Sequence, residues 1–178
     1  MRQQKFLFGL LLLSGLLIPG LAVPPEAAAC AGYTITVGSD GSRPQELLTQ
    51  IMAELIRQRT GTNIRLVRYK TEAELLAAAG RHDIDLLVAT LGPAGSQLFK
   101  KQKLLALKPF GYQSSRVVPV FRVETLKKFP ALRRLINRLA GKIDDDTLRR
   151  LIAELDDEQN VRVVAKKFLA EQKLVFGG

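Results

Sequence analysis

The strongest constraint on this chain is an alternation of short strand-like segments and amphipathic helical segments between residues 33 and 89. Residues 33–38, 63–69 and 84–89 are rich in Ile, Leu, Val and Thr and predict strands. Residues 43–60 and 71–80 lie between them and carry apolar side chains at helical spacing. A β-α-β-α-β order of this kind predicts a parallel sheet with right-handed crossovers, in which we expect the first strand to be central.

The second half of the chain has a different pattern. Residues 104–109 and 116–121 favour two more short strands, and apolar residues at helical spacing then predict helices over 132–139, 148–155 and 161–169. Asp144 to Asp146 are expected to cap the middle one of these helices. The expected fold class is therefore α/β, with a mainly parallel sheet flanked by helices and a helical C-terminal part, in a single domain over residues 33–178.

The first 29 residues are predicted to be a signal peptide rather than part of the fold. Arg2 and Lys5 precede an apolar run over residues 6–18, and Ala27-Ala28-Ala29 offers small residues for cleavage. The apolar run is shorter than the roughly 20 residues that a transmembrane helix needs. We therefore expect an exported protein located in the periplasm.

Cys30 leaves two routes of processing open. Ala27-Ala28-Ala29-Cys30 is similar to a degenerate lipobox, which would make Cys30 a lipidated N-terminus that anchors the protein. Ala27 stands where a lipobox usually has Leu, and the polar residues 24–26 precede the site, so plain signal-peptidase cleavage is the favoured route. The chain has one Cys, so we expect no disulfide partner.

Composition excludes several classes of site. One Cys and one His are too few for a multi-cysteine metal site or a pair of catalytic histidines, so no metal and no cofactor are expected. His82 lies beside Asp83 without a Ser- or Cys-containing nucleophile motif, which favours a surface histidine over a catalytic one. We therefore expect no catalytic residues and no enzyme.

The net charge of +10 raises the question of a binding partner. Nucleic acid is not an expected partner for an exported protein. The densest basic cluster admits two interpretations, a solvated helix face or a docking patch for an anionic membrane or partner. It consists of Lys127, Lys128, Arg133, Arg134, Arg138 and Lys142.

Two loops are candidates for ligand binding, because ligands of open parallel sheets bind beyond the carboxyl ends of the strands. Ser39, Asp40 and Ser42 follow the first predicted strand, and Thr90 follows the third. Hydroxyls and free N–H groups at a helix N-terminus suit a carboxylate or another anion, whereas Asp40 opposes an anion and could meet a cation. The alternatives are a tight turn with Ser42 as N-cap, and a plain chain reversal at Gly92-Pro93.

Eight segments, taken in order, carry a resemblance to a known family. They are Ile35-Thr36-Val37-Gly38-Ser39, Thr60-Gly61-Thr62-Asn63-Ile64, Arg81-His82-Asp83-Ile84-Asp85-Leu86, Val118-Pro119-Val120, Glu124-Thr125-Leu126, Phe129-Pro130-Ala131-Leu132, Leu139 to Asp146 and Val164-Ala165-Lys166-Lys167-Phe168-Leu169. Together they resemble the glycine betaine/choline (osmoprotectant) class of ABC-transporter substrate-binding proteins, within the type II periplasmic binding proteins. The resemblance is stronger in the C-terminal part and spans most of residues 34–175.

The resemblance implies an exported solute-binding component of an ABC-type transport system. Such a component binds a small solute without catalysing a reaction and delivers it to an ABC permease. A quaternary ammonium compound is the solute class it implies. Only residues 91–110 separate the two matched parts, too few for a second lobe of roughly 50 residues, so we expect a single lobe. Where the family often has a Tyr-containing E-Y-T-G segment, this chain has Ala89-Thr90-Leu91-Gly92, and it has no Trp. A full aromatic cage is therefore not expected, and the alternative is a single-lobe relative that binds a protein or membrane partner instead of a solute.

Overall fold

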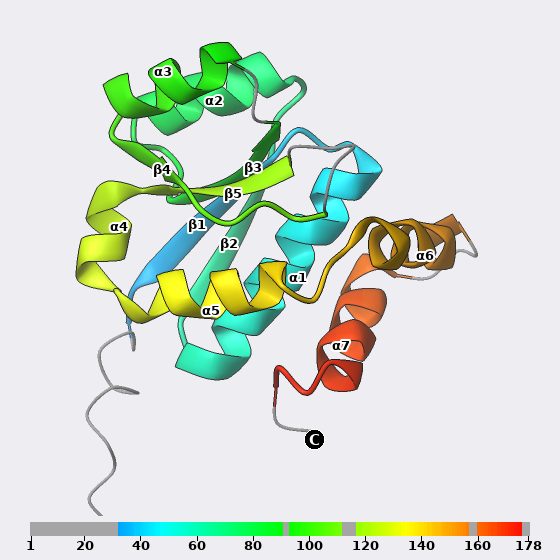
Figure 1. Cartoon of the computed structure of the whole chain (residues 1–178). Coiled ribbons are helices and arrows are strands. Elements are labelled where there is room, and N and C mark those ends of the chain that lie inside the picture. The colour runs from blue at the N-terminus through cyan, green and yellow to red at the C-terminus, as the bar shows by residue number, and fades with distance from the viewer. Residues whose placement is uncertain (1–31, 91–92, 112–116, 157–159, 176–178) are drawn as a thin grey trace, which may run out of the picture.

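A computed structural model describes residues 32–90, 93–111, 117–156 and 160–175 of the chain (Figure 1). Within this part a five-stranded sheet has the strand order β2-β1-β3-β5-β4. The strands are β1 (Thr34–Ser39), β2 (Asn63–Arg68), β3 (Leu86–Thr90), β4 (Leu104–Ala106) and β5 (Val117–Arg122).

The direction of the strands confirms the expected central position of β1. This strand pairs in parallel with β2, from Thr34 opposite Asn63, and also in parallel with β3. β5 is antiparallel to both β3 and β4, so β4 runs in the same direction as the first three strands. The sheet is therefore mainly parallel, with β5 as the one reversed strand among those described.

The helices confirm the expected crossovers and the helical C-terminus. α1 (Arg43–Thr60) connects β1 to β2, and α2 (Glu72–Gly80) connects β2 to β3. The remaining helices in the described part are α3 (Pro93–Lys101), α4 (Val123–Lys128), α5 (Ala131–Ala140), α6 (Asp145–Asp156) and α7 (Val161–Glu171). Asp144 caps α6 as expected, because its Oδ1 accepts a hydrogen bond of 2.7 Å from the Thr147 N–H.

Two helices, α3 and α4, were not expected from the sequence. Pro93 begins α3, a position that suits proline because its fixed φ is helical and its missing N–H has no intrahelical partner there. Gly92, the other half of the expected chain reversal, lies outside the described residues. Phe99 of α3 is buried against the sheet. One buried aromatic residue does not make a repeating apolar pattern, so the sequence did not predict this helix.

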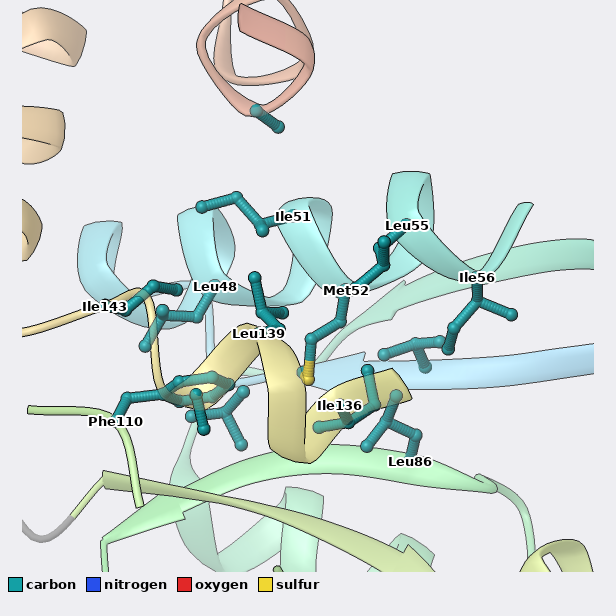
Figure 2. Packing of buried hydrophobic residues seen from close by; sticks show 14 of the residues in the cluster. Leu48, Ile51, Met52, Leu55, Ile56, Leu86, Phe110, Ile136, Leu139 and Ile143 are labelled. Atoms are coloured by element: carbon teal, nitrogen blue, oxygen red, sulfur yellow. The ribbon is translucent and has the colours of Figure 1, made fainter. Parts of the chain in front are cut away.

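The helices cover both faces of the sheet and give three layers (Figure 1). On one face α1, α5, α6 and α7 form the larger core with β1 and β3, and on the other α2 and α3 form a smaller one with β3 and β5. Met52 of α1 is fully buried in the larger core, and Figure 2 shows it pointing toward α5 and the sheet.

α1 lies between the sheet and α7. Its outer side carries Glu54, a carboxylate that is only 1% exposed. Glu54 Oε1 accepts hydrogen bonds from Arg57 Nη1 at 2.6 Å and from Arg162 Nε, at the start of α7, at 2.7 Å. This pairing of a buried carboxylate fixes the start of α7 beside α1. None of the described helices is long and apolar enough to cross a membrane.

Candidate functional site

Three of the four predicted binding residues lie in one loop at the carboxyl edge of the sheet. Ser39 ends β1 and is buried, Asp40 is half-buried, and Ser42 is exposed at the N-cap position of α1. Thr90 ends β3 at the same edge, since β1 and β3 are parallel neighbours. The topology therefore brings the predicted residues to one edge, as the sequence implied.

The loop between β1 and α1 is held by its own side chains. Asp40 Oδ1 accepts a hydrogen bond of 2.9 Å from the Ser42 N–H, and Gln45 Oε1 accepts one of 3.4 Å from the Asp40 N–H. Ser42 occupies the N-cap position but its hydroxyl makes no capping hydrogen bond. Asp40 thus supports the turn, which leaves its second carboxylate oxygen available at the edge of the sheet.

Arg68, at the end of β2, closes over this loop. Its Nη2 donates to the Gly41 carbonyl at 2.9 Å and to Glu46 Oε2 at 2.9 Å. Gly41 has a φ of +77°, and a Cβ there would collide with the Arg68 side chain. The left-handed backbone angle therefore favours glycine at this turn, and a larger residue would also have to displace the Arg68 side chain.

A pocket of about 480 Å³ lies beside this loop, between β2, α1 and the start of α7. Ser39 is the one predicted residue among its lining residues. The residues that line it are Ser39, Glu46, Thr49, Gln50, Leu66, Val67, Arg68, Asn160, Val161 and Arg162. We call this the edge pocket.

One wall of the edge pocket carries an unusual polar group. Thr49 of α1 is 3% exposed, and its Oγ1 is buried without a hydrogen-bond partner. A buried hydroxyl without a partner costs roughly 1–3 kcal/mol, so folded proteins rarely leave one unpaired. Thr49 is therefore a group to which a bound solute or an ordered water could add a hydrogen bond.

The charges of the edge pocket are mixed. The guanidinium groups of Arg68 and Arg162 can donate to a carboxylate or another anion, and the carboxylate of Glu46 can meet a cation. Apolar contacts come from Leu66, which is 44% exposed, and from its neighbour Val67. None of the described lining residues is aromatic, so this pocket offers no aromatic cage for a quaternary ammonium group.

The other predicted residues lie apart from the edge pocket. The Thr90 N–H donates to Glu72 Oε1 at 3.4 Å, and Thr90 is not among the residues that line the pocket. Cys30 lies outside the described residues. His82 is exposed and precedes β3. Among the described residues no group of three or more His, Cys, Asp or Glu side chains is placed to hold a metal ion.

The sequence analysis missed the residues that give the edge pocket its polar character. Arg68 ends the second strand of the parallel set, so the rule used for Ser39 and Thr90 could have found it. Thr49 lies among the apolar residues of α1, so its place in the pocket wall could not be recognised from the sequence. Arg162 is brought to the site by its bond to Glu54, 108 residues away in the chain, and the local sequence carries no signal for such a contact.

Comparison with known proteins finds similarity to one class of transport proteins. Residues 97–171, from α3 to α7, match the family model for the substrate-binding domain of ABC-type glycine betaine transport systems. A solved glycine betaine/carnitine/choline ABC transporter structure superposes with a TM-score of 0.68 at 13% identity, covering 80% of this chain and 98% of that chain. The resemblance to the glycine betaine class of binding proteins is thereby confirmed.

Ligand-free YehZ from Escherichia coli superposes equally well, with a TM-score of 0.68 at 12% identity, covering 80% of this chain and 99% of that chain. At such low identities these two structures establish the fold alone, which is like that of the periplasmic binding proteins. The family match adds that the stronger resemblance lies in the C-terminal half, as expected from the sequence. The described residues form one sheet, consistent with the expected single lobe.

Proposed function

We propose that this chain is the exported solute-binding component of an ABC-type transport system of the glycine betaine/choline class. It captures a small solute without chemical change and presents it to an ABC permease. The observation that carries the proposal is the edge pocket, which opens at the carboxyl edge of the sheet in a chain whose residues 97–171 match the family model. Open α/β sheets bind ligands at this edge.

The pocket supports a solute with a carboxylate or other anionic group. Arg68 and Arg162 are its guanidinium donors, and Thr49 adds an unpaired hydroxyl. A positively charged group of the same solute would meet Glu46, and Ser39, Asp40, Ser42 and Thr90 remain the candidate residues around the edge. Because one lobe makes contacts on one side of a ligand only, we expect weak capture.

The proposal is tested by thermal unfolding of the chain without residues 1–29, in the presence of betaine, choline, carnitine, proline or small anions. A solute that binds the folded state raises Tm in proportion to the logarithm of its concentration above Kd. We expect at least one of these solutes to raise Tm. No shift with any of them, at concentrations well above millimolar, would contradict solute capture.

Arg68→Ala and Arg81→Ala form a matched pair for locating the site. Both arginines are 63% exposed and each pairs with one carboxylate, but Arg68 lines the edge pocket and Arg81 does not. The proposal expects the solute-dependent rise in Tm to shrink in Arg68→Ala and to persist in Arg81→Ala. An equal rise in both variants would place the solute elsewhere.

Export and processing at Cys30 form a separate part of the proposal. The two routes are cleavage before Cys30 and lipidation of Cys30. Plain cleavage predicts a chain that partitions into the aqueous phase, whereas lipidation predicts incorporation of a labelled fatty acid. Incorporation that disappears in Cys30→Ser would establish the lipoprotein route.

A further inference from the structure

The surface formed by α4, α5 and the adjoining loops carries a concentration of positive charge. Residues 123–142 contain six basic residues and one acidic residue, Glu124. The Lys108 N–H donates to Asn137 Oδ1 at 3.1 Å, which places a further lysine beside α5. All of these basic residues are exposed, and we call them the basic face: Lys108, Lys127, Lys128, Arg133, Arg134, Arg138 and Lys142.

The cations of the basic face are not paired with carboxylates in the part of the chain that the structure describes. Across the residues that the structure describes, no salt bridge links the basic face to a carboxylate, whereas Arg150 and Lys167 on the neighbouring helices both pair with Glu154. Arg134 and Arg138 lie one helical turn apart, a spacing at which like charges destabilise a helix. The face therefore carries a cost in the isolated protein that an anionic partner would remove.

Two residues of the basic face line an apolar hollow. A pocket of about 260 Å³ is lined by Leu105, Val123, Leu126 and Pro130, with Lys127 and Arg133 completing its wall. Apolar side chains among long basic side chains are the composition with which proteins lie on lipid headgroups, since the cations meet the phosphates and the apolar groups enter the boundary below them.

The N-terminal end of the described chain lies at the same place. Tyr33 packs against Phe129 with ring centroids 5.1 Å apart, and Lys128 Nζ lies 3.9 Å from the centre of the Tyr33 ring. Cys30 precedes Tyr33 by three residues, which can span at most about 10–11 Å. An anchor at Cys30 would therefore lie at most about 10–11 Å from Tyr33, a distance comparable with the Debye length of about 8 Å at physiological salt.

We propose that the basic face is a docking surface for anionic phospholipid, which orients the protein on the membrane with α4 and α5 toward the headgroups (Figure 1). The occupant is argued from the charge of the face, its apolar hollow and the position of Tyr33. Electrostatic attraction to an anionic surface acts per cation and adds across the face. The inference goes beyond the proposed function and does not depend on which solute is bound.

The test uses a chain that begins at residue 31, since the described fold lies within residues 32–175 and neither the apolar run nor Cys30 is then present. Sedimentation with vesicles of phosphatidylcholine alone is compared with sedimentation with vesicles that also contain phosphatidylglycerol. We expect binding to the anionic vesicles only, with affinity that falls as salt is added. Equal binding to both vesicles, or no binding to the anionic ones, would overturn the proposal.

A triple variant, Arg133→Gln, Arg134→Gln and Arg138→Gln, locates the contact. A matched triple, Lys70→Gln, Lys100→Gln and Lys166→Gln, removes the same charge from exposed positions outside the basic face. We expect the first triple to weaken vesicle binding at least about tenfold and the second to leave it within about twofold. Equal loss in both would mean that net charge alone drives binding and would overturn the assignment, and thermal unfolding of each variant shows that it is folded.

Discussion

Asp85 and Arg122 join the start of β3 to the end of β5, with Asp85 Oδ1 and Arg122 Nη2 2.6 Å apart. The same Oδ1 accepts a hydrogen bond of 2.7 Å from Thr125 Oγ1, and Oδ2 accepts one of 3.0 Å from the Thr36 N–H on β1. Arg122 also donates to the His82 carbonyl. This buried network therefore fastens three neighbouring strands and α4 at the edge opposite the edge pocket.

Asp85→Ala is expected to destabilise the protein strongly. It leaves the Thr36 N–H and the mostly buried Arg122 guanidinium without their acceptor, and breaking a buried pair in this way costs about 3–5 kcal/mol. Urea unfolding measures the loss. Asp83→Ala is the control, since Asp83 forms an exposed pair with Arg81 and its loss is expected to cost no more than about 1 kcal/mol. Similar losses in both variants would contradict a structural role for Asp85.

Thr49→Val should distinguish a hydroxyl that awaits a solute from one that supports the fold. In the absence of solute the substitution removes a buried group without a partner, so we expect unchanged stability or a gain of about 1 kcal/mol. Thr125→Val removes a hydroxyl that donates to Asp85 and is expected to cost about 1.5–3 kcal/mol. If Thr49 contacts the solute, its variant also loses part of the solute-dependent rise in Tm. A large loss of stability in Thr49→Val would show that the hydroxyl has a structural partner.

The carboxylate of Asp144 is expected to titrate below its ordinary pKa of 3.8. Hydrogen bonds from the Thr147 side chain, and next from its backbone N–H, stabilise the charged form and lower the pKa of Asp144. Because the folded-state pKa is lowered, the stabilisation is present above the ordinary pKa and is lost as the pH falls through the folded-state pKa. Asp144→Asn should therefore be less stable than the parent at neutral pH, with a difference that closes in acid. A difference that persists unchanged in strong acid would be inconsistent with this cause.

Binding of betaine or choline is expected to be weak. A single lobe contacts its ligand from one side, and the edge pocket has no aromatic side chain among its described lining residues for cation–π contacts worth about 0.5–2 kcal/mol each. We predict no saturable binding of either compound below about millimolar concentration by isothermal titration. Where weak binding is detected, Ser39, Asp40, Ser42 and Thr90 are replaced by Ala in turn. Unchanged affinity in all four would move the site away from these loops, and micromolar affinity would contradict the argument from a single lobe.

Local features of the sequence predicted most of the fold. The β-branched strands and amphipathic helices between residues 33 and 89 determined the parallel arrangement, because that period and order leave few ways to bury their apolar faces. Thr71-Glu72-Ala73-Glu74 has the spacing of a capping box, and the Thr71 side chain accepts a hydrogen bond of 3.1 Å from the Glu74 N–H at the start of α2. α3 and α4 escaped prediction because they are short and depend on packing against the sheet rather than on a repeating apolar pattern.

The sequence by itself determined the family resemblance, the strand order of the parallel half and the edge at which Ser39 and Thr90 lie. Tertiary structure alone decided that Arg162 and Thr49 face one pocket with Ser39, and that the described chain begins beside the basic face. The physical reason is the separation along the chain of the residues that interact. Strand and helix patterns arise from neighbouring residues, whereas the site depends on contacts such as that of Arg162 with Glu54, made between residues far apart in the chain only once the core has closed.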